Sequence, residues 1–245
     1  MLTTIQYGSQ KLKINLSEPL DISIPLPLTR DNVGVLAWNQ KSPRLKKMRS
    51  IKKKHSSNFN SIYFKPHAHG THTECVGHIT KEFISLNQSL KQFFFLAEVV
   101  TVAPEKIDGD FVISKKQIQF VLGNKKREAI IIRTMPNTSD KLKRNYSKTN
   151  PPYLLEEAVE HLKNKGIEHL LIDLPSVDKE KDGGKLLAHN AFWNTNGRVR
   201  KSATITEFIF VPNSIKDGKY FLNLQIAPFE NNASPSKPIL YEVLN

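Results

Sequence analysis

The sequence predicts a mixed α/β fold with a β-rich sheet, formed by one domain over residues 1–245. An amphipathic segment, a glycine and an apolar segment follow one another between residues 154 and 173, which is the αβ half of a βαβ unit. Segments with strand character outnumber helical ones in the rest of the chain. Because no internal repeat or low-complexity linker divides the chain, a single domain is favoured.

The first half of the chain is expected to hold mostly strands. Residues 11–16 alternate in polarity as a half-buried strand does, and three prolines then interrupt the pattern. Residues 39–60 are polar and basic, so we expect a long loop there, with a partly helical segment as the alternative. Strands follow at 61–64, 93–103 and 128–133, and the last two are apolar enough to be buried.

One clear helix is expected in the second half. Its apolar side chains recur on one face, and Gly166 supplies the stop; they are Leu154, Leu155, Ala158, Val159 and Leu162. A buried strand at 169–173 comes directly after the glycine. Residues 204–211 and 220–227 complete the expected strands.

Composition indicates where the protein works. Cys75 is the only cysteine, so no intramolecular disulfide can form, which fits a reducing compartment. The chain has no apolar run long enough to span a membrane, and its first eight residues lack the plan of a signal peptide. We therefore expect a cytoplasmic protein that does not insert into membranes.

The formal net charge of +13 is concentrated in two stretches. Residues 41–54 hold eight basic residues and no acid, and a second basic cluster lies between residues 124 and 148. Such stretches can bind nucleic acid, but they are also typical of a solvated loop or of a face that attracts anionic substrates. No known nucleic-acid-binding motif accompanies the charge, so we do not expect nucleic acid to be the main partner.

Four of the eight histidines lie close together with Glu74: His67, His69, His72 and His78. Packing alone does not explain this cluster, because each buried imidazole needs hydrogen-bond partners. In an extended backbone His72 and Glu74 point to the same side, as do His67 and His69, and Gly70 offers a bend between the pairs. Imidazole and carboxylate together suit zinc, manganese or iron, so the segment predicts a metal site.

A second group of polar residues lies far along the chain. Asp173 and Asp178 follow the strand at 169–173, at the end where α/β enzymes collect functional residues. Glu207 lies inside an apolar strand, where a carboxylate is costly to bury unless it is paired or bound to metal. Taken singly, His189 fits a hydrogen-bonded surface residue and Glu207 a solvent-facing edge position. Beside the histidine cluster, both become candidates for completing a two-metal site.

These motifs resemble the cyclase family of metal-dependent hydrolases that includes bacterial kynurenine formamidase. Its hallmark is His-x-Gly-Thr-His-x-Asp-x-Pro-x-His, and residues 70–74 and His78 match it in order and spacing, with Glu74 in place of the aspartate. Residues 172–178 (IDLPSVD) resemble the family's Ile-Asp-Thr-Pro-Ser-x-Asp. Residues 188–189 and 205–207 resemble its later motifs, so the similarity runs nearly end to end.

The resemblance implies a swivelling β/β/α fold, a homodimer or larger homo-oligomer, and one or two divalent ions, with Zn²⁺ expected and Mn²⁺ as the alternative. It implies that His72, Glu74, His189 and Glu207 bind metal, with Glu74 bridging two ions. His78 would be the general acid/base.

Three features depart from the family pattern: Ala68, Glu74 in place of the aspartate, and residues 75–77 before His78. The first ligand of the family falls on Ala68 here, so His67 or His69 would replace it, and we expect His67 because it keeps the Pro-His pair. Cys75 is expected to be a small buried thiol, with a thiolate ligand as the alternative. Asp173 and Asp178 are expected to shape their loop and not to bind metal.

The expected function is hydrolysis of a C–N amide bond in a small molecule, most readily an aryl formamide such as N-formylkynurenine, as in tryptophan catabolism. Trp38, Phe64 and Trp193 are expected to be core residues, with stacking on an aromatic substrate as the alternative. The alternatives are a lactone or cyclic-amide hydrolase of the same family, or an inactive relative that binds metal or nucleic acid.

Overall fold

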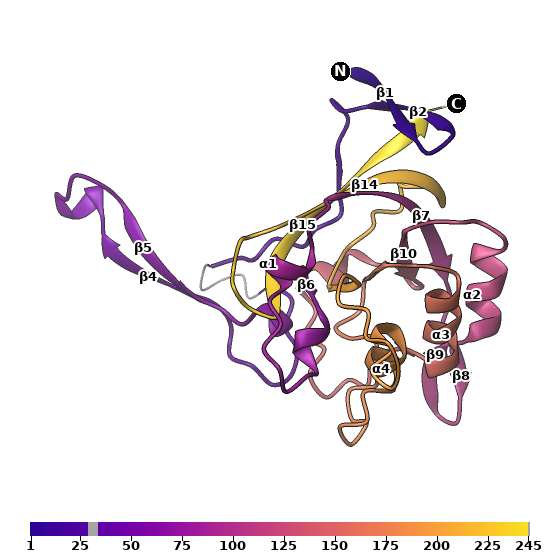
Figure 1. Ribbon diagram of the computed structural model, residues 1–245. Coiled ribbons are helices and arrows are strands. Elements are labelled where there is room, and N and C mark those ends of the chain that lie inside the picture. Colours follow the sequence, from indigo (N-terminus) through magenta and orange to yellow (C-terminus); the bar gives the residue numbers. More distant parts are fainter. Residues whose placement is uncertain (29–33, 245) are drawn as a thin grey trace.

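The computed structural model describes residues 1–28 and 34–244, and its centre is a barrel of seven strands (Figure 1). Each strand is hydrogen-bonded to the next, and β6 closes the circuit by pairing with both β13 and β15. In spatial order the strands are β15 (Ala233–Leu244), β14 (Gly218–Ile226), β7 (Phe94–Val102), β10 (Ala129–Thr134), β12 (His169–Ile172), β13 (Thr204–Glu207) and β6 (His72–Glu74). The expectation of a mixed, β-rich sheet is confirmed.

Four of these strands, β7, β10, β12 and β13, run parallel to one another and form the wall on which three of the four helices, all but the first in the chain, pack. The helices are α1 (Leu86–Ser89), α2 (Lys115–Leu122), α3 (Glu156–Asn164) and α4 (Leu187–Trp193). The parallel strands are apolar on both faces because both are covered. In β10, for example, Ile130 and Ile132 pack with the helices, while Ile131 lies in the second core cluster with β14 and β15.

Shorter strands extend this barrel. β1 (Leu2–Tyr7) and β2 (Gln10–Asn15) form a hairpin on the far end of β15, and β3 (Leu20–Asp21) also pairs with β15. A separate small sheet contains β8 (Glu105–Ile107), β9 (Asp110–Ile113) and β11 (Tyr153–Leu154). Four 3-10 turns complete the elements: Ile51–Lys53, Pro66–Ala68, Val76–His78 and Ser139–Lys143.

The expected strands at 11–16, 93–103, 128–133, 169–173 and 220–227 are present with small changes at their ends. The strand expected at 204–211 is shorter. It ends at Glu207 because Phe208 adopts a left-handed backbone with φ of 54°, which breaks the pleat. The expected helix begins two residues late, since Leu154 belongs to β11 and Leu155 precedes the first turn.

The expectation of a loop at 39–60 is wrong. Strands β4 (Arg44–Arg49) and β5 (Phe59–Tyr63) form an antiparallel hairpin that projects from the barrel (Figure 1). We call residues 44–63 the arm. Its strands lack the apolar alternation of a half-buried strand because both of its faces are largely exposed.

Within the described part of the chain, no helix is long and apolar enough to cross a membrane. The prediction that residues 1–245 form one domain stays a prediction.

Candidate metal centre

The structure brings together side chains from four parts of the chain at one end of the barrel. His72 and Glu74 lie on β6, which β13 and β15 hold from both sides, and Glu207 is the last residue of β13. Register places His72 opposite Glu207. His189 reaches the same point from the buried side of α4, and His67 and His78 from the 3-10 turns before and after β6.

Glu74 is the centre of this cluster. One carboxylate oxygen, Oε2, lies 2.9 Å from His67 Nδ1 and 3.9 Å from His78 Nε2. The other, Oε1, lies 3.1 Å from His189 Nε2. The carboxylate is buried, whereas the side chains of His67 and His78 are about 30% exposed, so they form the solvent side of the cluster.

The second carboxylate, Glu207, lies on the inner side. Its Oε2 is 3.4 Å from His72 Nε2, and its Oε1 is 4.0 Å from His189 Nε2 and accepts a hydrogen bond from the Val177 amide. His72 and Glu207 are both buried. Two groups of three donor atoms therefore form, each within 4.8 Å: His67, Glu74 and His78 in one, and His72, Glu74 and Glu207 in the other.

The donor set fits divalent ions. Six buried side-chain polar atoms have no hydrogen-bond partner within the described residues, and three of them belong to this cluster: His67 Nδ1, His72 Nε2 and Glu74 Oε2. All three face the cluster, and His67 Nδ1 and Glu74 Oε2 are close without hydrogen-bond geometry. Buried polar atoms are costly when they are unpaired, and nitrogen and carboxylate donors that converge in this way suit zinc or manganese. Glu74 belongs to both groups, which is the position of a bridging carboxylate.

The pKa shifts show how burial and mutual charge affect the ionisation of these groups. Burial raises the pKa of Glu207 well above its usual range, and the charge of Glu74 raises it further. Burial also opposes ionisation of Glu74, but the surrounding histidines outweigh it and hold its pKa well below the usual range. Burial disfavours protonation of His189, yet Asp178 and Glu74 raise its pKa to about 10. Glu74 is thus ionised, whereas Glu207 and His189 hold protons that a divalent cation would displace.

Asp178 orients His189 and does not enter either donor group. Its Oδ2 lies 2.5 Å from His189 Nδ1, and it also accepts hydrogen bonds from the backbone amides of Ala188 and His189 in the first turn of α4. This leaves the other ring nitrogen of His189 facing Glu74. Asp173 instead pairs at 2.8 Å with the buried Lys141, away from the cluster.

The geometry distinguishes His67 from His69, the two candidates for the position shifted by Ala68. Both ring nitrogens of His69 have backbone partners, since Nδ1 accepts from the Lys65 amide and Nε2 lies 3.0 Å from the Lys41 carbonyl oxygen. His67 points toward Glu74, and its Nε2 lies 3.1 Å from Asn232 Oδ1. Asn232 was not expected from the sequence, because an asparagine in an irregular segment carries no signal of such a role.

Three further expectations concern residues around the centre. Cys75 is buried and donates weakly to the Ile84 carbonyl, which is the expected small thiol. Trp193 is fully buried with its Nε1 donating to the Ala203 carbonyl, which confirms the expected core role and excludes the alternative of stacking on a substrate. The Nε1 of Trp38 donates to the His67 carbonyl and supports that turn, while Phe64 contacts Phe229.

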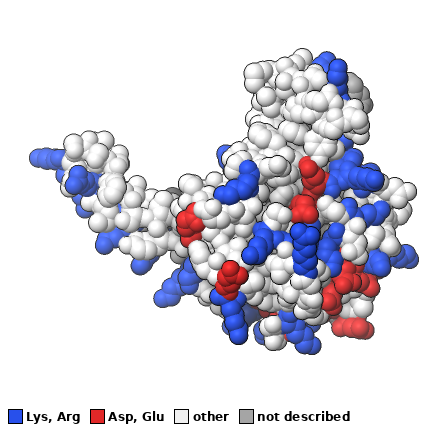
Figure 2. Space-filling model, in the orientation of Figure 1, with Lys and Arg blue, Asp and Glu red and all other residues white. Residues whose placement is uncertain are grey.

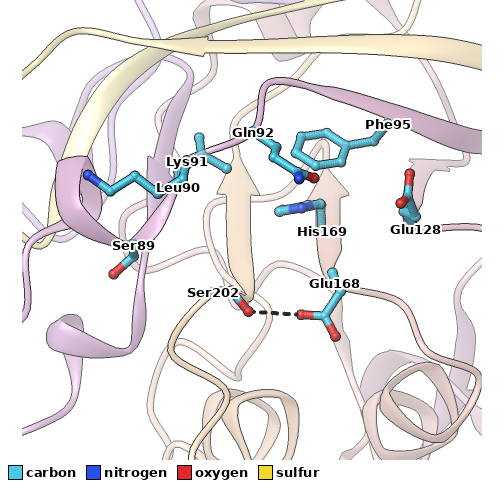
Figure 3. Close-up of a pocket in the computed structure, with 9 residues that line it drawn as sticks. All are labelled: Ser89, Leu90, Lys91, Gln92, Phe95, Glu128, Glu168, His169 and Ser202. Carbon is cyan, nitrogen blue, oxygen red and sulfur yellow. Dashed lines mark hydrogen bonds between the residues drawn. The ribbon is translucent and has the colours of Figure 1, made fainter.

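A cavity of about 390 Å³ lies at the opposite end of the barrel, where the parallel strands begin (Figure 3). His169 projects into it beside Phe95, and burial lowers the pKa of this histidine to about 3, so it is neutral. Its Nδ1 lies 2.8 Å from Thr204 Oγ1. The acidic lining residue Glu168 is paired with Arg200. The residues that line this cavity contribute to neither donor group.

Comparisons with known proteins agree with this architecture. The family model described as "Putative cyclase" matches residues 14–179, about two thirds of the chain. A search of curated proteins finds no match.

Three solved structures superpose over almost the whole chain. A protein described as a potential metal-dependent hydrolase with cyclase activity has a TM-score of 0.66 and 15% identity, covering 92% of this chain and 98% of its own. An isatin hydrolase bound to the product analogue thioisatinate has a TM-score of 0.65 and 16% identity, covering 93% of both chains. Isatin hydrolase A from Labrenzia aggregata has a TM-score of 0.67 and 12% identity, covering 93% of this chain and 94% of its own.

These likenesses confirm the swivelling β/β/α fold class. Because the family model covers more than half of the sequence, the chain belongs to the cyclase family.

Proposed function

We propose that this chain is a metal-dependent hydrolase that cleaves a C–N amide bond, in the first place an aryl formamide such as N-formylkynurenine. The observation that carries the proposal is the position of Glu74, a buried carboxylate shared by two groups of converging donors. The names of structurally similar proteins, which include a metal-dependent hydrolase and isatin hydrolases, support the same reaction type.

The residues divide into ligands and a proton carrier. His72, Glu74 and Glu207, joined by His189, would hold the inner ion, and His67 and Glu74 the outer one. We expect zinc first and manganese as the alternative. When bound, the ions supply a water of lowered pKa and polarise the carbonyl that it attacks.

His78 is the candidate for moving the proton. Burial lowers its pKa to about 4, so the imidazole is neutral at pH 7 and can accept a proton from the attacking water. The same nitrogen can then donate that proton to the departing amine. His78 lies on the partly exposed side of the cluster, where a substrate arrives from solvent.

A second candidate substrate class is a cyclic amide such as isatin. The specific support is the fold similarity to two isatin hydrolases over more than nine tenths of each chain. Both classes are amides of an aromatic amine, and they differ in whether the amine stays attached to the product. The same donors and the same proton path serve either one.

The experiment compares both substrates with metal-free protein and with protein reloaded with Zn²⁺ or Mn²⁺. We expect the loaded protein to hydrolyse one of them and the metal-free protein to hydrolyse neither. His78→Gln should keep its bound metal and lose at least about 100-fold in turnover, which is the usual share of a general acid/base. His55→Gln, an exposed histidine on the arm, is the matched control. Full turnover by His78→Gln would show that His78 is not the general acid/base. Failure of the native chain to bind Zn²⁺ or Mn²⁺ would overturn the proposal of a metal-dependent hydrolase.

A further inference from the structure

The arm is the most strongly charged part of the surface. Nine of the 36 Lys and Arg residues lie between residues 41 and 65, which hold none of the 23 acids, so the rest of the chain carries a net charge of +4. Figure 2 shows these basic side chains along the projecting hairpin, away from the mixed charges of the barrel. None of the arm residues takes part in the donor groups of the metal centre.

One face of the arm combines these charges with aromatic rings. Residues directly opposite each other in an antiparallel pair share a face, and here Tyr63 is opposite Arg44 and Phe59 is opposite Arg49. Lys46 and Ser61 lie between the two pairs. Phe59 is 60% exposed and Tyr63 47% exposed, and the Arg44 guanidinium stacks 4.5 Å from the centre of the Tyr63 ring. The rings are four residues apart on one strand, about 13 Å.

This face has the two features that single-stranded nucleic acid requires. Cations follow the phosphates, and flat aromatic side chains provide surfaces on which bases stack regardless of sequence. The hairpin projects away from the barrel, so its exposed face is open to an extended strand (Figure 1). We propose that the arm binds single-stranded nucleic acid through Phe59, Tyr63 and the cations opposite them.

Two other occupants fit the arm less well. The turn at its tip, residues 50–58, carries three lysines and one large apolar residue, Ile51, so it has little to insert into a lipid bilayer. A second copy of the chain would have to cover the seven cations of the arm with a body that is itself positively charged. A nucleic acid supplies both the negative charge and the stacking surface. The proposal does not depend on the hydrolase reaction.

The test measures fluorescence anisotropy of a labelled 20-nucleotide uridine oligomer titrated with the full chain. If the three cations of this face contact phosphates, raising salt from 50 to 200 mM should weaken binding about 20-fold. Phe59→Ala should weaken binding at least about fivefold through lost stacking. Ile62→Ala is the matched control, because Ile62 is 51% exposed on the opposite face of the same strand, and it should change affinity less than about twofold.

Three results would overturn the proposal. The first is equal affinity for heparin and for the oligomer, with no effect of Phe59→Ala on either, which would show that charge attraction alone drives binding. Binding to phosphatidylserine vesicles without binding to the oligomer would identify a lipid surface. Self-association that Phe59→Ala abolishes, measured by sedimentation without oligomer binding, would identify a second copy. Circular dichroism of each variant shows whether the barrel is intact.

Discussion

Replacing Asp178 with asparagine keeps the size of the side chain and removes its charge. In the native chain Asp178 accepts hydrogen bonds from His189 Nδ1 and from two amides of α4. The aspartate therefore fixes the proton of His189 on Nδ1 and leaves Nε2 as the metal-binding atom. An asparagine that presents its amide to the ring would favour the other tautomer and place a proton where the ion binds.

The size of the effect follows from this geometry. Groups that orient a metal-binding histidine typically contribute 10- to 100-fold to metal affinity, which corresponds to about 1.4 to 2.7 kcal/mol. The contact here is short and buried, so we expect Asp178→Asn to fall near the upper end of that range. Competition with a chromophoric chelator measures the Zn²⁺ dissociation constant directly, without using activity.

Asp182→Asn provides the matched control. Asp182 lies on the same loop and accepts hydrogen bonds from the amides of Gly184 and Leu186, but it does not contact His189. Its substitution should leave the Zn²⁺ dissociation constant within about threefold of the native value. If Asp178→Asn binds Zn²⁺ as tightly as the native chain does, Asp178 does not orient a metal ligand and the reasoning fails.

Three further predictions concern the centre and its frame. His67→Asn should lower the number of bound ions, whereas His69→Asn should keep it, and metal analysis of the two purified variants would contradict the assignment if their content were reversed. Because the pKa of His189 is raised to about 10, its Nε2 proton must leave before an ion binds. The affinity for metal should therefore rise about tenfold per pH unit between pH 6 and 8. Calorimetry in buffers of different ionisation enthalpy measures the protons released on binding, and no release would contradict this prediction. Gly77→Ala would place its Cβ 2.2 Å from the Ile84 carbonyl oxygen. Overpacking of this kind lowers the free energy of unfolding by about 1–3 kcal/mol, so the thermal unfolding midpoint should fall. An unchanged midpoint would contradict this prediction.

The apolar strands of the barrel could be predicted because each carries its own local signal. Strands β7, β10 and β12 are continuous runs of β-branched and aromatic residues, which reflects burial on both faces. The twelve-residue β15 was missed, since Pro235 and Pro238 interrupt it and the pairing that forms it is with distant strands.

Three of the four helices were missed, and α2 and α4 were missed for different reasons. The helix α2 has a capping box between Ser114 and Gln117, a signal that was present in the sequence. The helix α4 begins after Leu186, a residue in a left-handed conformation. An amide in its first turn is capped by Asp178, which lies ten residues earlier in a loop. Only the folded chain shows that this aspartate supports both the helix and its histidine.

The candidate site was more accessible to prediction than the fold around it. His72, Glu74, His189 and Glu207 were selected from motif spacing, and the structure places them within contact of one another. Their roles as ligands stay a prediction. Spacing could not show that the turn at Pro66–Ala68 aims His67 at Glu74, because that direction depends on backbone contacts made elsewhere.

The three-residue strand that closes the barrel has a consequence for synthesis of the protein. Its neighbours are contributed by residues 204–207 and 233–235, so it has neither partner while the first 200 residues leave the ribosome. Until then His72 and Glu74 lie on an unpaired segment, and Glu207 has not yet been made. If the cluster binds an ion as proposed, the complete set of donors forms only after residues 204–207 and 233–235 have been translated and have paired with β6.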